Sequence, residues 1–256
     1  MELLYGRHAV LESLRAGRRK VHRVYLATGA KQTGNVADIQ AAAHERDCPV
    51  VEAQRQTFER AGPVNHQGVL AETGPYPYVD LDHLLETPQD AQPIYLVLDH
   101  LQDVQNVGTL LRTAEAMAAT AVLLPDRRAA EITPAVVNAS AGAVEHLRVV
   151  MAGNLTQALE RLKRAGVWVV GLDARPEAVP LARADLSGPL ALVVGAEGAG
   201  LARLVRERCD WLVVIPMYGR IASLNAAVAG SVALIAARQA RGGEQTGPAG
   251  ARSGVS

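Results

Sequence analysis

Three stretches of this 256-residue sequence place glycines and polar side chains directly after apolar runs. They span residues 99–112, 193–200 and 215–230. In open parallel α/β sheets, ligands bind outside the carboxyl ends of the strands, so residues that follow strand-like runs are the first candidates for chemistry. None of the three stretches offers a nucleophile with a paired base, which disfavours covalent hydrolase chemistry.

The first stretch carries Asn106 and Gly108 where a loop is expected to become a helix. Backbone N–H groups and the helix dipole favour an anion at such a place. Arg112 follows in the second turn of that helix, from which its guanidinium could point back toward a bound ligand. The alternative is structural, with Asn106 capping the helix and Arg112 a solvated charge.

The second stretch, VVGAEGAG, holds Gly195, Gly198 and Gly200 after an apolar run. This glycine spacing departs from the dinucleotide-binding fingerprint, and the stretch lacks the Lys-Ser/Thr of a P-loop. Glycines still let the backbone approach a ligand closely, and Glu197 supplies one carboxylate between them. The alternative is a tight structural turn with an exposed glutamate.

In the third stretch, Pro216 and Gly219 prevent regular structure just after an expected strand. Ser223 is expected to cap the alanine-rich helix that follows. Asn225 has both donors and an acceptor, so it could orient a hydroxyl or a purine edge. The alternative makes Ser223 a cap and Asn225 an ordinary first-turn residue.

Composition limits the partners. Lys plus Arg and Asp plus Glu both total 26, so the net charge is zero and a nucleic acid must be held by a local basic patch. One Phe, two Trp and six Tyr are too few for a module that stacks bases on aromatic platforms.

The remaining signals favour a cytoplasmic protein with neither a metal site nor a membrane span. Cys48 and Cys209 form no C-x-x-C pair and are expected to be reduced thiols. The seven histidines show no metal-ligand spacing, and the N-terminus lacks a signal-peptide core. The uncharged stretch 221–237 is expected to be a buried helix.

Short apolar runs alternate with helical segments, which predicts an α/β fold with a mostly parallel sheet covered on both faces. In the C-terminal part, strands are expected at 94–99, 121–124, 167–172, 190–194 and 211–215, and helices at 107–117, 155–165, 201–207 and 223–238. Shorter elements before them predict a small α/β domain at 1–73. The prolines and glycine near residue 75 predict a linker at 74–92, followed by the main domain at 93–241 and a disordered tail at 242–256.

Taken together and in order, the three stretches resemble the signature motifs of the SPOUT-class RNA 2′-O-methyltransferases, in the SpoU or TrmH branch. The first family motif has an Asn, a Gly and then R-T-A, matched by Asn106, Gly108 and residues 112–114. The second reads G-A-E-G-x-G, matched at 195–200.

The third motif reads I-P-M-x-G followed by S-L-N, matched at 215–219 and 223–225. A connecting S-A-G-A-x-E-H is matched at 140–146. The match covers about residues 93–238, and three motifs in order are far more specific than any one.

The opening residues 4–10 resemble the start of the RNA-binding N-terminal domain in the RlmB-type members, which methylate a guanosine of 23S ribosomal RNA. The run 15–23 adds five Arg or Lys and no acid, which could neutralise phosphates. The residues expected to contact RNA are Arg7, His8, Arg15, Arg18, Arg19, Lys20 and Arg23. The alternative for the basic run is a solvated helix end and loop.

The resemblance implies a trefoil knot in the C-terminal domain, a homodimer, and S-adenosylmethionine as the cofactor. The residues carried over as cofactor contacts are Gly195, Gly200, Ile215, Met217 and Leu224. Arg112 becomes the proposed base at the ribose 2′-hydroxyl. Because arginine is effectively always protonated, it could instead stabilise developing oxyanion charge while solvent or phosphate takes the proton.

In the same carry-over, Asn106, Ser223 and Asn225 position ribose and phosphate, and Glu197 binds the RNA or fixes Arg112. Three alternatives stay open at this stage. The substrate could be transfer RNA, or the chain could be a non-catalytic RNA-binding or ribosome-assembly factor on the same scaffold. A dinucleotide-dependent oxidoreductase is the third, and the glycine spacing counts against it.

Overall fold

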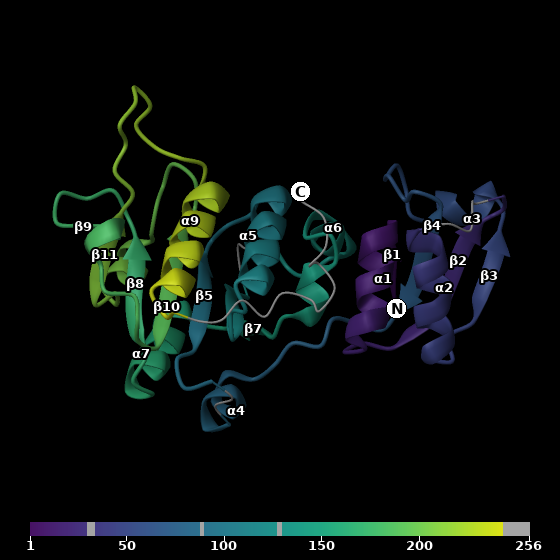
Figure 1. Cartoon of the computed structure of the whole chain (residues 1–256), viewed down its shortest axis with the longest axis horizontal. Helices are drawn as coiled ribbons and strands as arrows, with labels where there is room; N and C mark the ends of the chain where they lie inside the picture. The colour runs from purple at the N-terminus through teal and green to yellow at the C-terminus, as the bar shows by residue number, and fades with distance from the viewer. Residues whose placement is uncertain (30–33, 88–89, 127–129, 243–256) are drawn as a thin grey trace, which may run out of the picture.

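Two β-sheets organise the protein, shown in Figure 1 as a computed structural model that describes residues 1–29, 34–87, 90–126 and 130–242. The smaller sheet has the order β1–β4–β2–β3 and consists of β1 (Glu2–Tyr5), β2 (Val21–Ala27), β3 (Val50–Ala53) and β4 (Val69–Thr73). The larger has the order β7–β6–β5–β10–β8–β11–β9 and consists of β5 (Ile94–Asp99), β6 (Ala121–Pro125), β7 (Val149–Ala152), β8 (Trp168–Leu172), β9 (Val179–Pro180), β10 (Leu190–Gly195) and β11 (Trp211–Val214).

Every strand pairing within the described part of the larger sheet is parallel. In the smaller sheet, β2 pairs with β3 in parallel, and β4 pairs antiparallel with β1 and β2. The predicted α/β class, with a parallel C-terminal sheet and a small N-terminal α/β unit, is confirmed. The trefoil knot stays a prediction.

Helices cover both sheets and fill the connections. They are α1 (Arg7–Ala16), α2 (Asn35–Glu45), α3 (Arg55–Glu59), α4 (Leu81–Glu86), α5 (Val104–Ala116), α6 (Pro134–Ala139), α7 (Leu155–Arg164), α8 (Arg203–Arg206) and α9 (Ala226–Gln239), with 3₁₀ turns η1 (Ala143–His146) and η2 (Leu181–Arg183). None of the described helices is long and apolar enough to cross a membrane.

The larger sheet is buried on both faces, which is why its strands are apolar throughout. Along β5, Leu96 and Leu98 belong to the core that α5 and α9 cover, whereas Tyr95 and Val97 belong to the core on the side of α4 and α7. Figure 1 shows α5 and α9 side by side across one face of this sheet. The uncharged stretch 221–237 is therefore partly the sheet-covering helix α9, as predicted, and partly the loop before it.

The predicted linker 74–92 is an ordered connection over its described residues. Tyr76 is buried, and its hydroxyl lies 2.9 Å from the carbonyl oxygen of Val144 and 2.7 Å from that of Leu147. Further along, α4 packs on the larger sheet through Leu81 and Leu84. Of the predicted tail, all but Gly242 lies outside the described residues.

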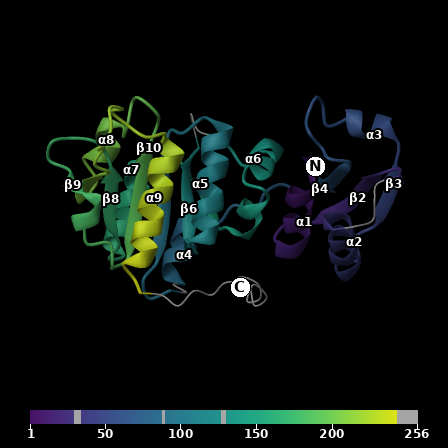
Figure 2. The ribbon, with the colours of Figure 1, turned by 45° about the horizontal axis from the view of Figure 1, so that its top comes forward.

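One of the apolar clusters extends through both units. Leu4 and Val10, from the N-terminal unit, belong to the same cluster of buried side chains as Val136 and Val144 of the larger unit. Figure 2 shows α1 on the side of the N-terminal unit that faces α6. The two units are thus packed together and not merely tethered.

Candidate active site

A cavity of about 580 Å³ lies at the carboxyl ends of three neighbouring strands, β10, β8 and β11. Its walls come from the loops that follow these strands, at residues 172–174, 194–200 and 213–217, and from residues 222–226 before α9. This is the edge where ligands bind in parallel α/β sheets. All five predicted cofactor contacts, Gly195, Gly200, Ile215, Met217 and Leu224, line it.

The glycine loop after β10 is both a tight turn and a wall of this cavity. A Cβ on Gly195 would lie 2.3 Å from the backbone of Gly200, so the loop can fold back on itself only with glycine there. Gly200 has a left-handed backbone (φ +65°), as does Gly198 (φ +74°). The tight turn of the structural interpretation is therefore present. The role of this stretch in ligand binding is compatible with it and stays a prediction.

Three side chains from three separate segments meet at the rim, and we call Asn106, Glu197 and Asn225 the loop cluster. Glu197 Oε1 accepts hydrogen bonds from Asn106 Nδ2 (3.1 Å) and from Asn225 Nδ2. Asn225 Nδ2 also donates to Asn106 Oδ1 at 2.9 Å. Asn106 thus meets Glu197, which lies 91 positions away in the sequence, and Asn225, which lies 119 positions away, as the motif resemblance implied.

The helix after the third loop starts later than predicted. Asn225, not Ser223, is the N-cap of α9, and its Oδ1 accepts from the backbone N–H of Ala227 (2.9 Å) and Val228 (3.2 Å). Ser223 is exposed and lines the cavity. The sequence suggested Ser223 because both residues are good caps; the site uses Asn225, whose amide nitrogen still reaches Glu197.

The first stretch also differs from expectation. Its helix, α5, begins at Val104 with Asp103 as the N-cap, so Asn106 lies in the first turn and Gly108 lies inside the helix. A Cβ on Gly108 would come within 2.5 Å of Ala139 Cβ. The prediction that a loop becomes a helix at Asn106 and Gly108 is therefore wrong. Gly108 is needed because α5 packs closely against α6.

Arg112 is not drawn into the loop cluster. It lies exposed on α5, and its guanidinium has no hydrogen-bond or ion-pair partner among the described residues. Its neighbour Thr113 hydrogen-bonds Ser231 of α9 at 2.8 Å, so this stretch of α5 is anchored against α9. The proposed catalytic roles of Arg112, Asn106, Glu197, Ser223 and Asn225 stay predictions.

Sequence reasoning missed Asp173, which lines the cavity directly after β8. The rule that pointed to the other loops, namely that ligands bind after strands, also pointed to this residue, but no family motif was matched there. The same applies to Asp99 and His100 after β5. Asp99 is buried, accepts from the backbone N–H of Ala202 (2.6 Å), and lies 2.5 Å from His100 Nδ1.

His100 and Asn106 line a second cavity of about 390 Å³ that shares Ala196 and Glu197 with the first. His100 adopts a left-handed backbone (φ +58°), which is uncommon outside glycine and asparagine. Among the described residues, no three His, Cys, Asp or Glu side chains gather as metal ligands would.

The prediction that Arg19 contacts RNA is wrong. Arg19 is buried, with 1% of its side chain exposed, and both ends of its guanidinium are paired with carboxylates, so it cannot reach a phosphate. Arg18 is half-buried, with Nη1 donating to Tyr76 Oη (3.2 Å) and Nη2 to the Pro77 carbonyl (3.2 Å). The others are exposed or half-buried on the N-terminal unit, and they are Arg7, His8, Arg15, Lys20 and Arg23.

Comparison with known proteins gives first the class and then the family. Residues 3–79 match the family model described as RNA 2′-O ribose methyltransferase substrate binding, and together with the methylase match that follows this makes the chain an RNA ribose 2′-O-methyltransferase. Residues 93–235 match the SpoU rRNA Methylase family. The chain belongs to this family, which confirms the resemblance found in the sequence.

Curated relatives cover nearly the whole chain. A Pseudomonas putida protein named 23S rRNA (guanosine-2′-O-)-methyltransferase RlmB is 39% identical over 94% of this chain and 97% of its own length. A Bacillus subtilis protein named putative TrmH family tRNA/rRNA methyltransferase YacO is 37% identical over 89% of this chain and 91% of its own.

Solved structures share the fold. A crystal structure described as RNA 2′-O ribose methyltransferase has a TM-score of 0.77 at 25% identity, covering 93% of this chain and 88% of its own. An rRNA methyltransferase from Sinorhizobium meliloti with bound AdoMet has a TM-score of 0.75 at 26% identity, covering 93% and 87%.

Proposed function

We propose that the protein transfers a methyl group from S-adenosylmethionine to the 2′-hydroxyl of a guanosine in 23S ribosomal RNA. The cavity at the carboxyl ends of β10, β8 and β11, lined by all five residues predicted to bind the cofactor, carries this proposal. The RlmB name of the Pseudomonas putida relative supports the choice of 23S RNA. Transfer RNA is the second candidate, because the Bacillus subtilis relative is named for both RNAs.

The residues of the cavity fit S-adenosylmethionine. Its volume of about 580 Å³ lies within the range of small-molecule and cofactor sites. Apolar side chains such as Leu172 and Ile215 suit the adenine ring, and the carboxylates of Asp173 and Glu197 suit the positively charged sulfonium and ammonium groups of the cofactor. When bound, S-adenosylmethionine supplies a methyl group already activated by a sulfonium, so the protein mainly has to align the acceptor.

The loop cluster fixes its side chains before RNA arrives. Glu197 accepts from both asparagine amides, and Asn225 is anchored by capping α9, so these groups present ordered dipoles to a ribose and its phosphate. The guanidinium N–H groups of Arg112 have no partner among the described residues, and an arginine side chain stays protonated in proteins. It therefore serves as a fixed positive charge near the 2′-oxygen, and the proton leaves to solvent or an RNA phosphate.

The active form is a homodimer in this proposal. Along α9, Val228, Val232 and Ile235 are 47%, 39% and 40% exposed and follow helical spacing, which gives one apolar stripe. A second copy would cover this stripe. It would also approach Arg112, because α5 lies beside α9 (Figure 1).

The reaction takes place in the cytoplasm, in keeping with two free thiols, Cys48 and Cys209, and requires no metal. The experiment is to incubate the protein with labelled S-adenosylmethionine and either 23S RNA or transfer RNA, and to map the labelled ribose. One labelled guanosine in 23S RNA is the expected result. Label in transfer RNA alone would select the second candidate, and a failure to bind S-adenosylmethionine in calorimetry would leave a non-catalytic RNA-binding factor.

A further inference from the structure

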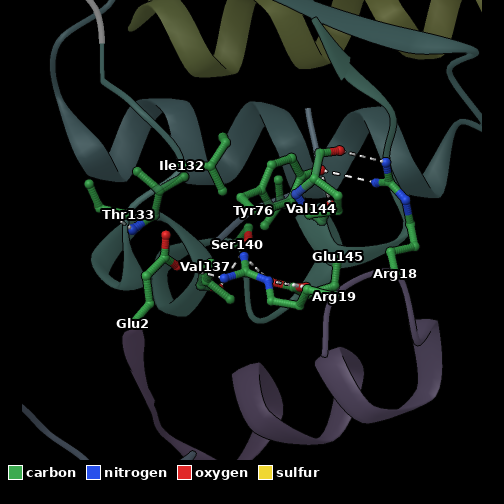
Figure 3. Close-up of polar contacts among 12 residues, drawn as sticks. Glu2, Arg18, Arg19, Tyr76, Ile132, Thr133, Val137, Ser140, Val144 and Glu145 are labelled. Carbon is green, nitrogen blue, oxygen red and sulfur yellow. Dashed lines mark hydrogen bonds and ion pairs between the residues drawn. The ribbon is translucent and has the colours of Figure 1, made fainter. Parts of the chain in front are cut away.

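A buried polar cluster lies where the N-terminal unit meets the larger unit (Figure 3). We call Glu2, Arg19, Tyr76 and Glu145 the junction cluster. Arg19 donates to both oxygens of Glu145, from Nη2 to Oε1 at 2.7 Å and from Nε to Oε2 at 3.0 Å. Its Nη1 donates to Glu2 Oε2 at 2.6 Å.

This ion pair joins the two units across 126 sequence positions and has no access to water. The exposed fraction is 1% for the Arg19 side chain and 0% for Glu145. The ring of Tyr76, from the connecting segment, lies 5.1 Å from the Arg19 guanidinium carbon and 5.7 Å from that of Arg18. All three parts of the chain therefore converge on one point.

The surrounding contacts bring the two units into close packing. A Cβ on Gly142 would lie 2.7 Å from Glu12 Cβ of α1 and 2.8 Å from the carbonyl oxygen of His8. Beside it, His146 Nε2 lies 2.8 Å from Glu12 Oε2. The junction is therefore closely packed, and the bidentate pair adds a directional constraint that apolar contacts lack.

A buried ion pair is a poor source of stability, because desolvation of both charges offsets their attraction. Burial raises the pKa of the Glu145 carboxyl above its ordinary value, and the neighbouring Arg19 only partly opposes this. What the pair does supply is fixed geometry. The exposed basic residues of the N-terminal unit consequently stand at a set distance from the cavity.

We propose that Arg19 and Glu145 are positioning residues for RNA methylation, which lock the substrate-binding unit onto the catalytic unit so that one RNA contacts both at a fixed spacing. This inference rests on the proposed RNA methylation. Without the lock, an RNA held by the first unit reaches the cavity at a lower effective concentration. The loss therefore falls mainly on the KM for RNA.

The test compares two neighbouring cations in the full-length protein. Arg19→Met leaves Glu145 buried without a partner, which favours separation of the units. We expect a larger radius of gyration in X-ray scattering, chymotryptic cleavage between residues 74 and 92, and a KM for RNA raised by about tenfold to a hundredfold. Affinity for S-adenosylmethionine should stay within twofold of wild type, and Glu145→Gln serves as a milder variant should Arg19→Met fail to fold.

Lys20→Met removes the same charge from the next, exposed position. This variant should weaken RNA binding while the two units stay docked. The slope of log affinity against log salt concentration should become smaller by about one. Arg55→Met, on exposed α3, is the control for charge loss that should change neither property.

The double variant Arg19→Met/Glu145→Leu removes the unpaired charge and should restore docking, but the KM for RNA should stay raised, because apolar contacts lack the directional constraint of the ion pair. Docked units with normal KM in Arg19→Met and in Glu145→Gln would overturn the proposal. So would a double variant that docks with a normal KM, because apolar packing alone would then set the spacing of the two units. Scattering and proteolysis need no methylation, so they test the lock even if wild type proves inactive on RNA.

Discussion

The loop cluster and the junction cluster each gather polar side chains from distant parts of the chain around a glutamate, and they differ in their exposure to solvent. Asn106, Glu197 and Asn225 meet at the open rim of a cavity, where they keep each other ordered and still face a substrate. In the junction cluster, Arg19 is buried and its donors are taken up by Glu145 and Glu2. The difference in exposure is what we expect between groups proposed to act on RNA and groups proposed to hold the two units together.

The strongest test of this contrast pairs Arg112 with Arg19. Arg112→Ala should lower methyl transfer by about 10²- to 10³-fold, because a fixed positive charge near the reacting oxygen is lost. Its free energy of unfolding should change by less than about 0.5 kcal/mol, since the side chain is exposed and unpaired among the described residues. Turnover assays, calorimetry with S-adenosylmethionine and urea unfolding measure the three quantities. Normal turnover in this variant would remove Arg112 from the mechanism.

Arg19→Met should show the reverse pattern in the same unfolding experiment. Leaving Glu145 buried without its partner should cost about 3–5 kcal/mol of folding free energy. Calorimetry should show affinity for S-adenosylmethionine unchanged. A stability loss as small as that of Arg112→Ala would contradict the contrast between the two clusters.

A third test separates the two roles of Asn225. Asn225→Ala removes both the cap of α9 and the contact with Glu197, so it should lose about 1 kcal/mol of stability together with activity. Asn225→Asp keeps a capping oxygen but places a second carboxylate beside Glu197, so stability should be retained and activity lost. Equal stability of the two variants, measured by thermal unfolding, would mean that the cap contributes little.

The smallest expected effect concerns how the free energy of unfolding changes with pH. Because burial raises the pKa of Glu145 in the folded protein, the native state binds its proton more tightly than the unfolded chain. Stability from this group is therefore full below the unfolded pKa, about 4.3, and decreases as pH rises through the folded value. Arg19 and Arg18 oppose the shift, and Glu2 adds to it.

Glu145→Gln supplies the reference for this slope, because glutamine does not titrate. The free energy of unfolding of wild type, relative to the variant, should fall as pH rises above about 4.3. Urea titrations at several pH values measure the difference. A difference that rises with pH would show that Arg19 outweighs burial.

Local patterns in the sequence predicted much of the fold. The alternation of apolar runs with helical segments located β5 at residues 94–99 without error, because a strand buried on both faces has an unmistakable composition. The four-residue strands β1 and β7 were missed, although the equally short β11 was located. The start of α9 was misplaced because Ser223 and Asn225 are equally plausible caps.

The candidate site could be predicted only because separate motifs were taken together. No local pattern shows that Asn106 hydrogen-bonds residues 197 and 225; that follows from the order of strands in the sheet. The error at Arg19 has the same origin. A run of five basic residues is typical of a phosphate-binding surface, and only the approach of Glu145 from a distant part of the chain turns one of them inward.

The shared apolar core, in which Leu4 and Val10 pack together with Val136 and Val144, restricts how this chain can evolve. If the first 73 residues were exchanged for an unrelated RNA-recognition module, the remaining part would expose a large apolar surface. We expect such a protein to aggregate. We therefore expect a change of RNA target to be tolerated through point mutation of exposed residues such as Arg15, Lys20 and Arg23 more readily than through exchange of the whole N-terminal unit.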